Sequence, residues 1–390
     1  MNISEEQLRK DIAKLEHLLM RKYNKKNYAL EYIIIASYDD ILKNIYGETT
    51  FVEDRIMSED VYKIIQDLER NIIRNVCKFY NTNKDIMLNG FKSFESIFDD
   101  KEYLSYLPPF RISSMSKKDF TELLLSYFSI YGDKIYKIVK KYIDEGRIEL
   151  GSSMLNTTTG VFIESSCLKN GYITVDKGRR YDILTLTTLC HELGHAIDSE
   201  TFLFPQSKRL ISSEDILTEV PSCFFEIGFL KYLIDCNYYS KDAHVILADT
   251  YSMGRGMMSE YRNVNALESF YLDHLGHVVS ANGKYVDPEG NEMDMLEDGS
   301  FPCDTANMIE AMKYSLGIYL SLNMNELCKS DREKYLKQLF NFTTSRKESD
   351  FKELINMLGI SREDFESARL VKPTIDREME LVKKITYKHV

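Results

Sequence analysis

The chain has 390 residues, of which 44% are hydrophobic and 28% charged, and its formal net charge is −11. This composition is ordinary for a globular protein, and the length favours two or three subdomains. The acidic balance argues against nucleic acid or an anionic membrane as the main partner.

The N-terminus and the cysteines favour a cytoplasmic protein. Residues 1–6 are polar and acidic and lack the apolar core of a signal peptide. The sequence contains no run of about 18 apolar residues, so it predicts no transmembrane helix. The seven cysteines are scattered and contain no CxxC pair, which is typical of reduced thiols. The sequence leaves the oligomeric state open.

Helical periodicity dominates the first part of the chain. Apolar residues recur at helical spacing over residues 5–23, 28–46, 56–80 and 118–145. Turn-like residues interrupt the pattern at 81–83 and at 108–109. We therefore expect an N-terminal helical subdomain over residues 1–105 and a second domain over residues 106–390.

The pattern changes after Gly146. Three short β-type runs follow, punctuated by Gly, Ser, Thr and Asn, and they predict a small sheet. These runs are Ile148–Leu150, Gly160–Ile163 and Gly171–Val175. Helical spacing resumes at about Asp182 and again from about Met308 to the end. Between these helical stretches, Asn282-Gly283 favours a hairpin over residues 277–286.

The strongest chemical signal is the HExxH sequence His191-Glu192-Leu193-Gly194-His195, in a helical run that Asp182 can cap. Residues four apart share one face of a helix, so both imidazoles can reach one ion. A catalytic zinc takes nitrogen and oxygen ligands and keeps one position for water. Glu192 can accept the proton of that water. The alternative is a helix whose two histidines are held by hydrogen bonds alone.

A catalytic zinc also needs a third protein ligand, and an acidic helix downstream offers several carboxylates. We expect this helix to be capped by Ser212 or Ser213 and to bend near Leu217, because Pro221 interrupts its hydrogen bonds. Glu219 is the preferred ligand. It shares a helical face with Ser222 and Glu226. The other acidic candidates are Glu214, Asp215 and Glu226.

These residues resemble the thimet oligopeptidase and oligoendopeptidase F family of zinc peptidases. Members carry HExGH and then a helix with a Glu-x-x-Ser core and a further Glu seven residues after the ligand. Here these positions are Glu219-Val220-Pro221-Ser222 and Glu226. Gly160-Val161-Phe162 is similar to the family's Gly-Ala-Phe strand, and Lys313–Gly317 to its Tyr-Ala-Thr-Gly helix. The resemblance spans roughly residues 110–380.

The chain departs from the family in three respects. Its N-terminal half is shorter, and Asp198 stands where many members have a histidine. Many members also carry a histidine shortly before a tyrosine cluster that binds the tetrahedral intermediate. Here Tyr314 matches that cluster cleanly, with Tyr319 nearby, whereas His274 and His277 lie well upstream.

The resemblance implies a mainly α fold: a helical body around a deep substrate cleft, with a small β-sheet beside the HExxH helix. Residues 106–390 would form a zincin-like catalytic domain holding one zinc ion. The expected activity is hydrolysis of internal bonds in short peptides by a zinc-activated water. Tyr314 is the expected donor to the oxyanion, and the reserves are Tyr319, His274 and His277.

Further roles are expected around the metal. A zinc-bound imidazole donates its second N–H to a nearby acceptor, and Glu226 and Asp198 are the candidates. Asp198 could instead simply end the helix. The run containing Gly171, Tyr172 and Ile173 is expected to be an edge strand that pairs with an extended peptide.

Three other functions compete with this one. The first is a toxin-like zinc protease with a single protein target. The second is a non-catalytic descendant that binds or senses peptides, although the intact Glu192 argues against it. The third is a regulatory HExxH protein with a DNA-binding module, for which the sequence offers no basic recognition helix.

Overall fold

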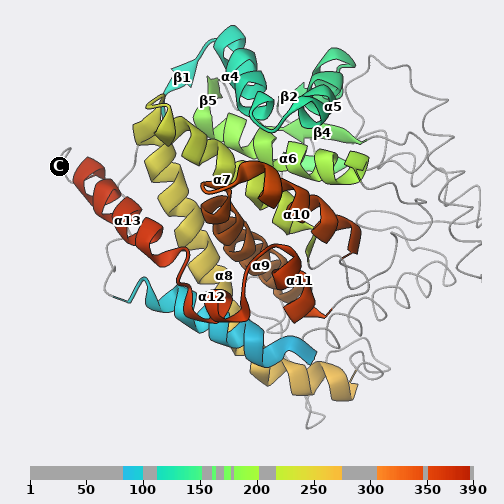
Figure 1. Ribbon diagram of the computed structural model, residues 1–390, viewed down its shortest axis with the longest axis vertical. Coiled ribbons are helices and arrows are strands. Elements are labelled where there is room, and N and C mark those ends of the chain that lie inside the picture. The colour runs from blue at the N-terminus through green and yellow to red at the C-terminus, as the bar shows by residue number, and fades with distance from the viewer. Residues whose placement is uncertain are drawn as a thin grey trace, which may run out of the picture. The chain divides into compact units, whose positions relative to one another are not determined.

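The computed structural model describes residues 82–99, 112–151, 160–163, 171–176, 180–201, 217–274, 305–345 and 350–386. Helices predominate in this part of the chain, and its strands form two small sheets, which confirms the predicted mainly α fold. The packing divides these residues into two units. Unit 1 contains the described residues from 113 to 201, and unit 2 contains residues 82–99, 112 and those from 217 onward. Figure 1 labels most of the helices and strands of both units.

The predicted N-terminal subdomain lies mostly outside the described residues. Of its expected helices, those over 5–23, 28–46 and 56–80 fall there, as does the hairpin at 277–286. Residues 82–96 are helical and belong to unit 2 with the C-terminal helices. The Ser93 hydroxyl donates to the backbone oxygen of Glu366 at 2.5 Å. The boundary at residue 105 stays a prediction, although this helix groups with the C-terminal half.

Unit 1 begins with strand β1 (Ser114–Met115) and the helices α4 (Lys117–Ser129) and α5 (Asp133–Asp144). The sequence predicted one helix over 118–145, which is wrong because the chain breaks at Gly132. Gly132 has a φ of 88°, a conformation that glycine adopts without the steric penalty of a side chain.

The three β-type runs form one sheet, as predicted. Its strands are β2 (Ile148–Leu150), β3 (Gly160–Ile163) and β4 (Tyr172–Val175), in the order β2-β4-β3. Strand β2 runs parallel to β4, and β3 runs antiparallel to it.

The central position of β4 corrects the expectation that Gly171, Tyr172 and Ile173 lie on an edge strand. Both edges of β4 are occupied by neighbouring strands, and Ile173 is fully buried. The backbone N–H of Gly171 donates to the Tyr142 hydroxyl of α5 at 2.9 Å. A substrate backbone therefore has no free edge to pair with on β4.

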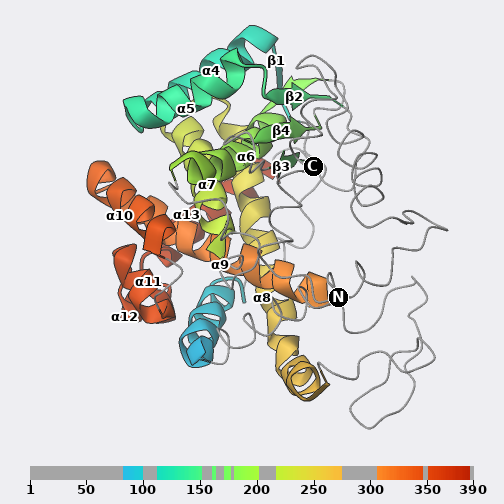
Figure 2. The ribbon, with the colours of Figure 1, turned by 90° about the vertical axis from the view of Figure 1, so that its right-hand side faces the viewer.

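Strand β5 (Tyr181–Asp182) pairs antiparallel with β1 and leads directly into helix α6 (Ile183–Thr201). The Asp182 carboxylate accepts a hydrogen bond of 2.8 Å from the backbone N–H of Thr185. This contact confirms Asp182 as the predicted cap, because it satisfies a donor that the first helical turn leaves unpaired. Helix α6 packs on β3 and β4, an arrangement that can be followed in Figure 2.

Unit 2 is built from helices, and the predicted helical pattern after Met308 is confirmed. Besides the helix over residues 82–96, the elements are α7 (Glu219–Asp235), α8 (Ser240–His274), α9 (Thr305–Cys328), α10 (Arg332–Ser345), α11 (Phe351–Met357), α12 (Arg362–Ser367) and α13 (Lys372–Thr386). Helices α7, α8 and α9 pack against one another. Every helix in the described residues is too short or too polar to span a bilayer.

Helix α9 approaches the start of α7 closely. A Cβ atom at Gly317 would lie 2.7 Å from the Cβ of Glu219, so the backbone of α9 touches this residue. One turn later, the Ser321 hydroxyl donates to the backbone oxygen of Val220 at 2.7 Å. These contacts anchor the first turn of α7 on α9.

A partly buried ion pair holds the other end of α7. The Lys231 ammonium lies 2.6 Å from Glu326 of α9, and Thr374 of α13 donates to the same carboxylate at 2.9 Å. Burial lowers the pKa of Lys231, and the negative charge of Glu326 opposes that effect. Breaking this pair would leave a partly buried charge without compensation, so the pair constrains how the three helices pack.

Candidate metal centre

The HExxH residues lie in the buried middle of α6. His191 and Glu192 are buried, whereas His195 is partly exposed. The two imidazole centroids are 5.0 Å apart, as expected for rings one helical turn apart on the same face. The spacing of the motif therefore produces the paired imidazoles that the sequence predicted.

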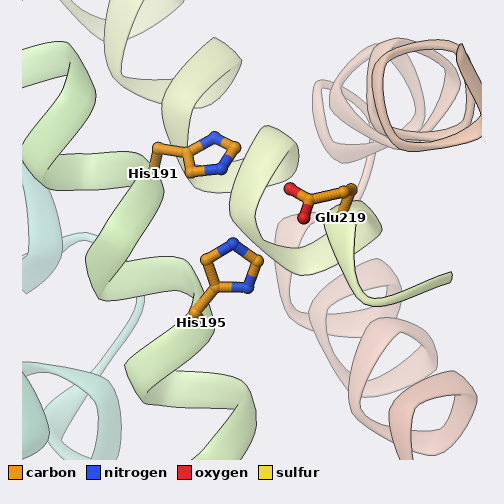
Figure 3. A group of neighbouring side chains, drawn as sticks. All are labelled: His191, His195 and Glu219. Carbon is orange, nitrogen blue, oxygen red and sulfur yellow. The ribbon is translucent and has the colours of Figure 1, made fainter. Parts of the chain in front are cut away.

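Glu219 supplies a carboxylate to the same group. One ligand atom from each of His191, His195 and Glu219 lies within 4.8 Å of the other two. In Figure 3 both imidazoles project from α6 toward the carboxylate, which points back at them from α7. Two imidazoles and one carboxylate form a donor set typical of catalytic zinc, with a fourth position left for water. The residues present thus fit the predicted ion.

A second combination of side chains shares one of these histidines. His191, Cys223 and Glu226 also have ligand atoms within 4.8 Å of one another. A thiolate is a good zinc ligand, so this group is an alternative donor set. Cys223 was not among the residues predicted from the sequence, although it follows Glu219 by four residues and so lies on the same helical face.

The cysteines of the described residues are free thiols. They are Cys190, Cys223, Cys236 and Cys328, and the first two are buried. This agrees with the reduced thiols that the sequence predicted for these four positions.

The start of α7 differs from the prediction. The helix begins at Glu219, so Pro221 lies in its first turn rather than at a bend near Leu217. Backbone N–H groups in the first turn have no acceptor within the helix, and a proline there costs no hydrogen bond. The predicted caps Ser212 and Ser213 lie outside the described residues, together with Glu214 and Asp215.

Ser222 holds the Glu219 side chain. Its fully buried hydroxyl lies 2.9 Å from the carboxylate oxygen Oε2 of Glu219 and 2.9 Å from the backbone oxygen of the same residue. A hydroxyl that donates to a ligating carboxylate fixes its orientation before the metal binds. The Glu-x-x-Ser spacing therefore places the Ser222 hydroxyl where it can orient the carboxylate of Glu219, the candidate ligand.

Replacing Ser222 with Ala should weaken zinc binding by about 10- to 100-fold, the range for residues that orient metal ligands. Titration against a chelator of known zinc affinity measures this. Ser321→Ala is the matched control, because it also removes a buried hydroxyl at the α7–α9 contact but not one bonded to a carboxylate. Equal losses in the two variants would contradict the orienting role.

Only some of the remaining predicted residues lie in the part of the chain that the structure describes. Asp198 is buried within α6, which continues to Thr201, so the alternative that it ends the helix is wrong. Glu226 is partly buried on α7, and Tyr314 is partly exposed on α9. His274 is the last residue of α8, and nothing of its side chain is described. His277 lies outside the described residues.

Tyr319 belongs to the core of unit 2, which corrects its expected role as a reserve oxyanion donor. Its ring is fully buried against Phe94 and Phe365, and its hydroxyl donates to the backbone oxygen of Phe365. Burial raises the pKa of this phenol far above its ordinary value. Because its only proton is used within the core, Tyr319 has none to offer a substrate.

The fold defines the chain as a mainly helical protein with a small sheet packed on an HExxH helix. A protein of Bacillus anthracis str. Ames assigned as an oligoendopeptidase F has a similar structure, with a TM-score of 0.51 and 11% sequence identity. The match covers 91% of this chain and 64% of that one. A protein of Chlamydophila abortus assigned as a peptidase gives a TM-score of 0.48 and 14% identity, over 80% of this chain and 55% of that one. PZ peptidase A with an inhibitor gives a TM-score of 0.49 and 13% sequence identity, over 95% of this chain and 66% of that one.

The chain therefore spans between about half and two thirds of the length of these structures. No protein-family model and no curated protein matches its sequence. At such low identity, the likeness to the Bacillus anthracis structure establishes the fold alone.

Proposed function

We propose that the chain is a zinc-dependent peptidase that hydrolyses internal bonds of short peptides. The observation that carries this proposal is the grouping of ligand atoms of His191, His195 and Glu219 within 4.8 Å, in a motif whose second residue is Glu192. The shared fold with a structure assigned to oligoendopeptidase F supports it. A cytoplasmic location and one zinc per chain belong to the same proposal.

Each residue then has a definite task. A zinc ion bound here supplies a Lewis acid that makes a coordinated water acidic near neutral pH. The Glu192 carboxylate accepts a proton from the attacking water and later delivers it to the leaving amine. Glu219 presents a carboxylate oxygen to the metal, held by Ser222. Glu226 is the candidate acceptor for the second N–H of an imidazole.

Tyr314 is the proposed donor to the developing oxyanion. It precedes Gly317 by three residues on α9, and therefore shares the helical face that contacts Glu219. Its side chain is partly exposed, in contrast to the buried Tyr319. A hydroxyl in this position could stabilise negative charge that appears only in the transition state.

Strand β3 takes over the substrate-binding role that was expected of Gly171, Tyr172 and Ile173. Among the described residues it pairs only with β4, on one of its two edges. It also packs on α6, the helix that carries Glu192. An extended peptide added to the other edge would form backbone hydrogen bonds that do not depend strongly on its sequence.

Digestion of a mixture of unrelated short peptides, followed by mass spectrometry, tests the proposal. Untreated protein should cut several peptides internally, chelator-treated protein should cut none, and added zinc should restore cleavage. A folded protein of the same composition should be cut more slowly than the peptides. Cleavage that survives complete zinc removal would refute the proposal. Zinc binding without cleavage of any peptide would favour a narrow protein target or a peptide-binding descendant.

A further inference from the structure

Strand β3 touches α6 directly at the residues that carry the chemistry. A Cβ atom at Gly160 would lie 2.8 Å from Oε1 of Glu192 and 2.6 Å from Cγ2 of Thr188. Two residues along the strand, the Phe162 ring lies nearly parallel to the imidazole of His195, with 6.3 Å between their centroids. Alternate residues of a strand share one face, so the same face of β3 meets both Glu192 and His195.

The glycine at position 160 is explained by this contact and not by its backbone conformation. Its φ lies outside the left-handed region, so an alanine could adopt the same backbone angles. A side chain here would instead approach its neighbours more closely than real Cβ atoms do. The strand backbone thus reaches the general base only because residue 160 has no side chain.

The neighbours of Gly160 limit how a clash could be relieved. Gly160 is paired with Val175 of the central strand, which opposes movement of β3 away from α6. The Thr188 hydroxyl donates to the backbone oxygen of Leu184 at 3.1 Å, and this bond restrains the rotation that would move its methyl group aside. The Glu192 carboxylate, at the end of a flexible side chain, is the group that would be displaced.

We propose that Gly160 is a positioning residue: by bringing the backbone of β3 against Glu192, it holds the carboxylate where it can accept a proton from the attacking water. The consequence for turnover rests on the proposed function. The steric part of the proposal, a direct contact between residue 160 and Glu192, can be tested without any activity.

The variant Gly160→Ala should lower kcat by about 10- to 100-fold, because displacement of a catalytic group by about 1 Å costs rates of that order. KM should change by less than about 3-fold and the zinc content should stay at one per chain, because substrate and metal contacts are retained. Unchanged kcat in Gly160→Ala would overturn the proposal. So would a parallel loss of bound zinc, which would indicate general disruption of the site.

Gly151→Ala is the matched control. The backbone N–H of Gly151 donates to Val175 at 3.1 Å, so the two glycines flank the same residue of β4. A Cβ atom at Gly151 would meet nothing within 4 Å, and its φ is not in the left-handed region. Gly151→Ala therefore reduces the conformational entropy of the unfolded chain as Gly160→Ala does, but adds no clash in the folded chain, and it should keep full activity.

Thermal unfolding separates the steric contact from catalysis. Gly160→Ala should lower the melting temperature of the wild-type chain, and most of that loss should disappear in a Glu192→Ala, Thr188→Ser background. An equal loss of melting temperature in both backgrounds would overturn the proposed contact between residue 160 and Glu192, regardless of the activity that is measured. If the wild type cleaves no peptide but the coupling is present, the proposed function fails while Gly160 still positions the side chain of Glu192.

Discussion

The variant Glu192→Gln is expected to keep its zinc and lose most of its turnover. Glutamine has the same shape as glutamate but cannot accept a proton, so kcat should fall by about 10²- to 10⁴-fold. Because the proton transfer takes place in the transition state, kcat and kcat/KM should fall together while KM changes little. Steady-state kinetics on one cleaved peptide and metal analysis of the same sample measure these quantities.

Glu200→Gln controls for a change of charge on the same helix. Glu200 lies eight residues after Glu192 on α6, where its carboxylate is 3.0 Å from the Lys141 ammonium. Its replacement should leave kcat within about 2-fold, since Glu200 belongs to neither group of candidate ligands and its salt bridge to Lys141 is partly exposed. A Glu192→Gln variant with nearly normal kcat would exclude Glu192 as the base.

Replacement of the ligands should abolish zinc binding at micromolar protein concentration. His191→Ala and His195→Ala each remove one of three proposed protein ligands. The affinity for zinc should therefore fall by more than about 100-fold, which is the largest loss expected for residues that only orient the ligands. Equilibrium dialysis against buffered zinc gives the affinity, and circular dichroism shows whether each variant remains folded.

The two groups that share His191 make different predictions for α7. If Glu219 is the third ligand, Glu219→Gln should weaken zinc binding strongly, whereas Cys223→Ala should leave the affinity within about 3-fold. Glu226→Gln should have an intermediate effect, because an acceptor for an imidazole N–H contributes about 10- to 100-fold. Strong loss in Cys223→Ala with an unaffected Glu219→Gln would assign the zinc to His191, Cys223 and Glu226.

Much of the fold could be read from local patterns. The three β-type runs and the cap at Asp182 depend on residues close together in the chain, and all are present in the structure. The HExxH spacing likewise places His191 and His195 on one helical face. Helical periodicity did not show the break at Gly132, because the apolar spacing continues on both sides of it.

The sequence by itself thus determined which residues could bind a metal from one helix and which could accept a proton, because a helix imposes its own geometry over four residues. Only the tertiary structure decided the rest. It placed β4 between two strands, buried Tyr319 against Phe365, and brought the backbone of Gly160 against Glu192. Strand order, burial and close backbone approach depend on residues far apart in the chain. Local spacing carries no information about such contacts.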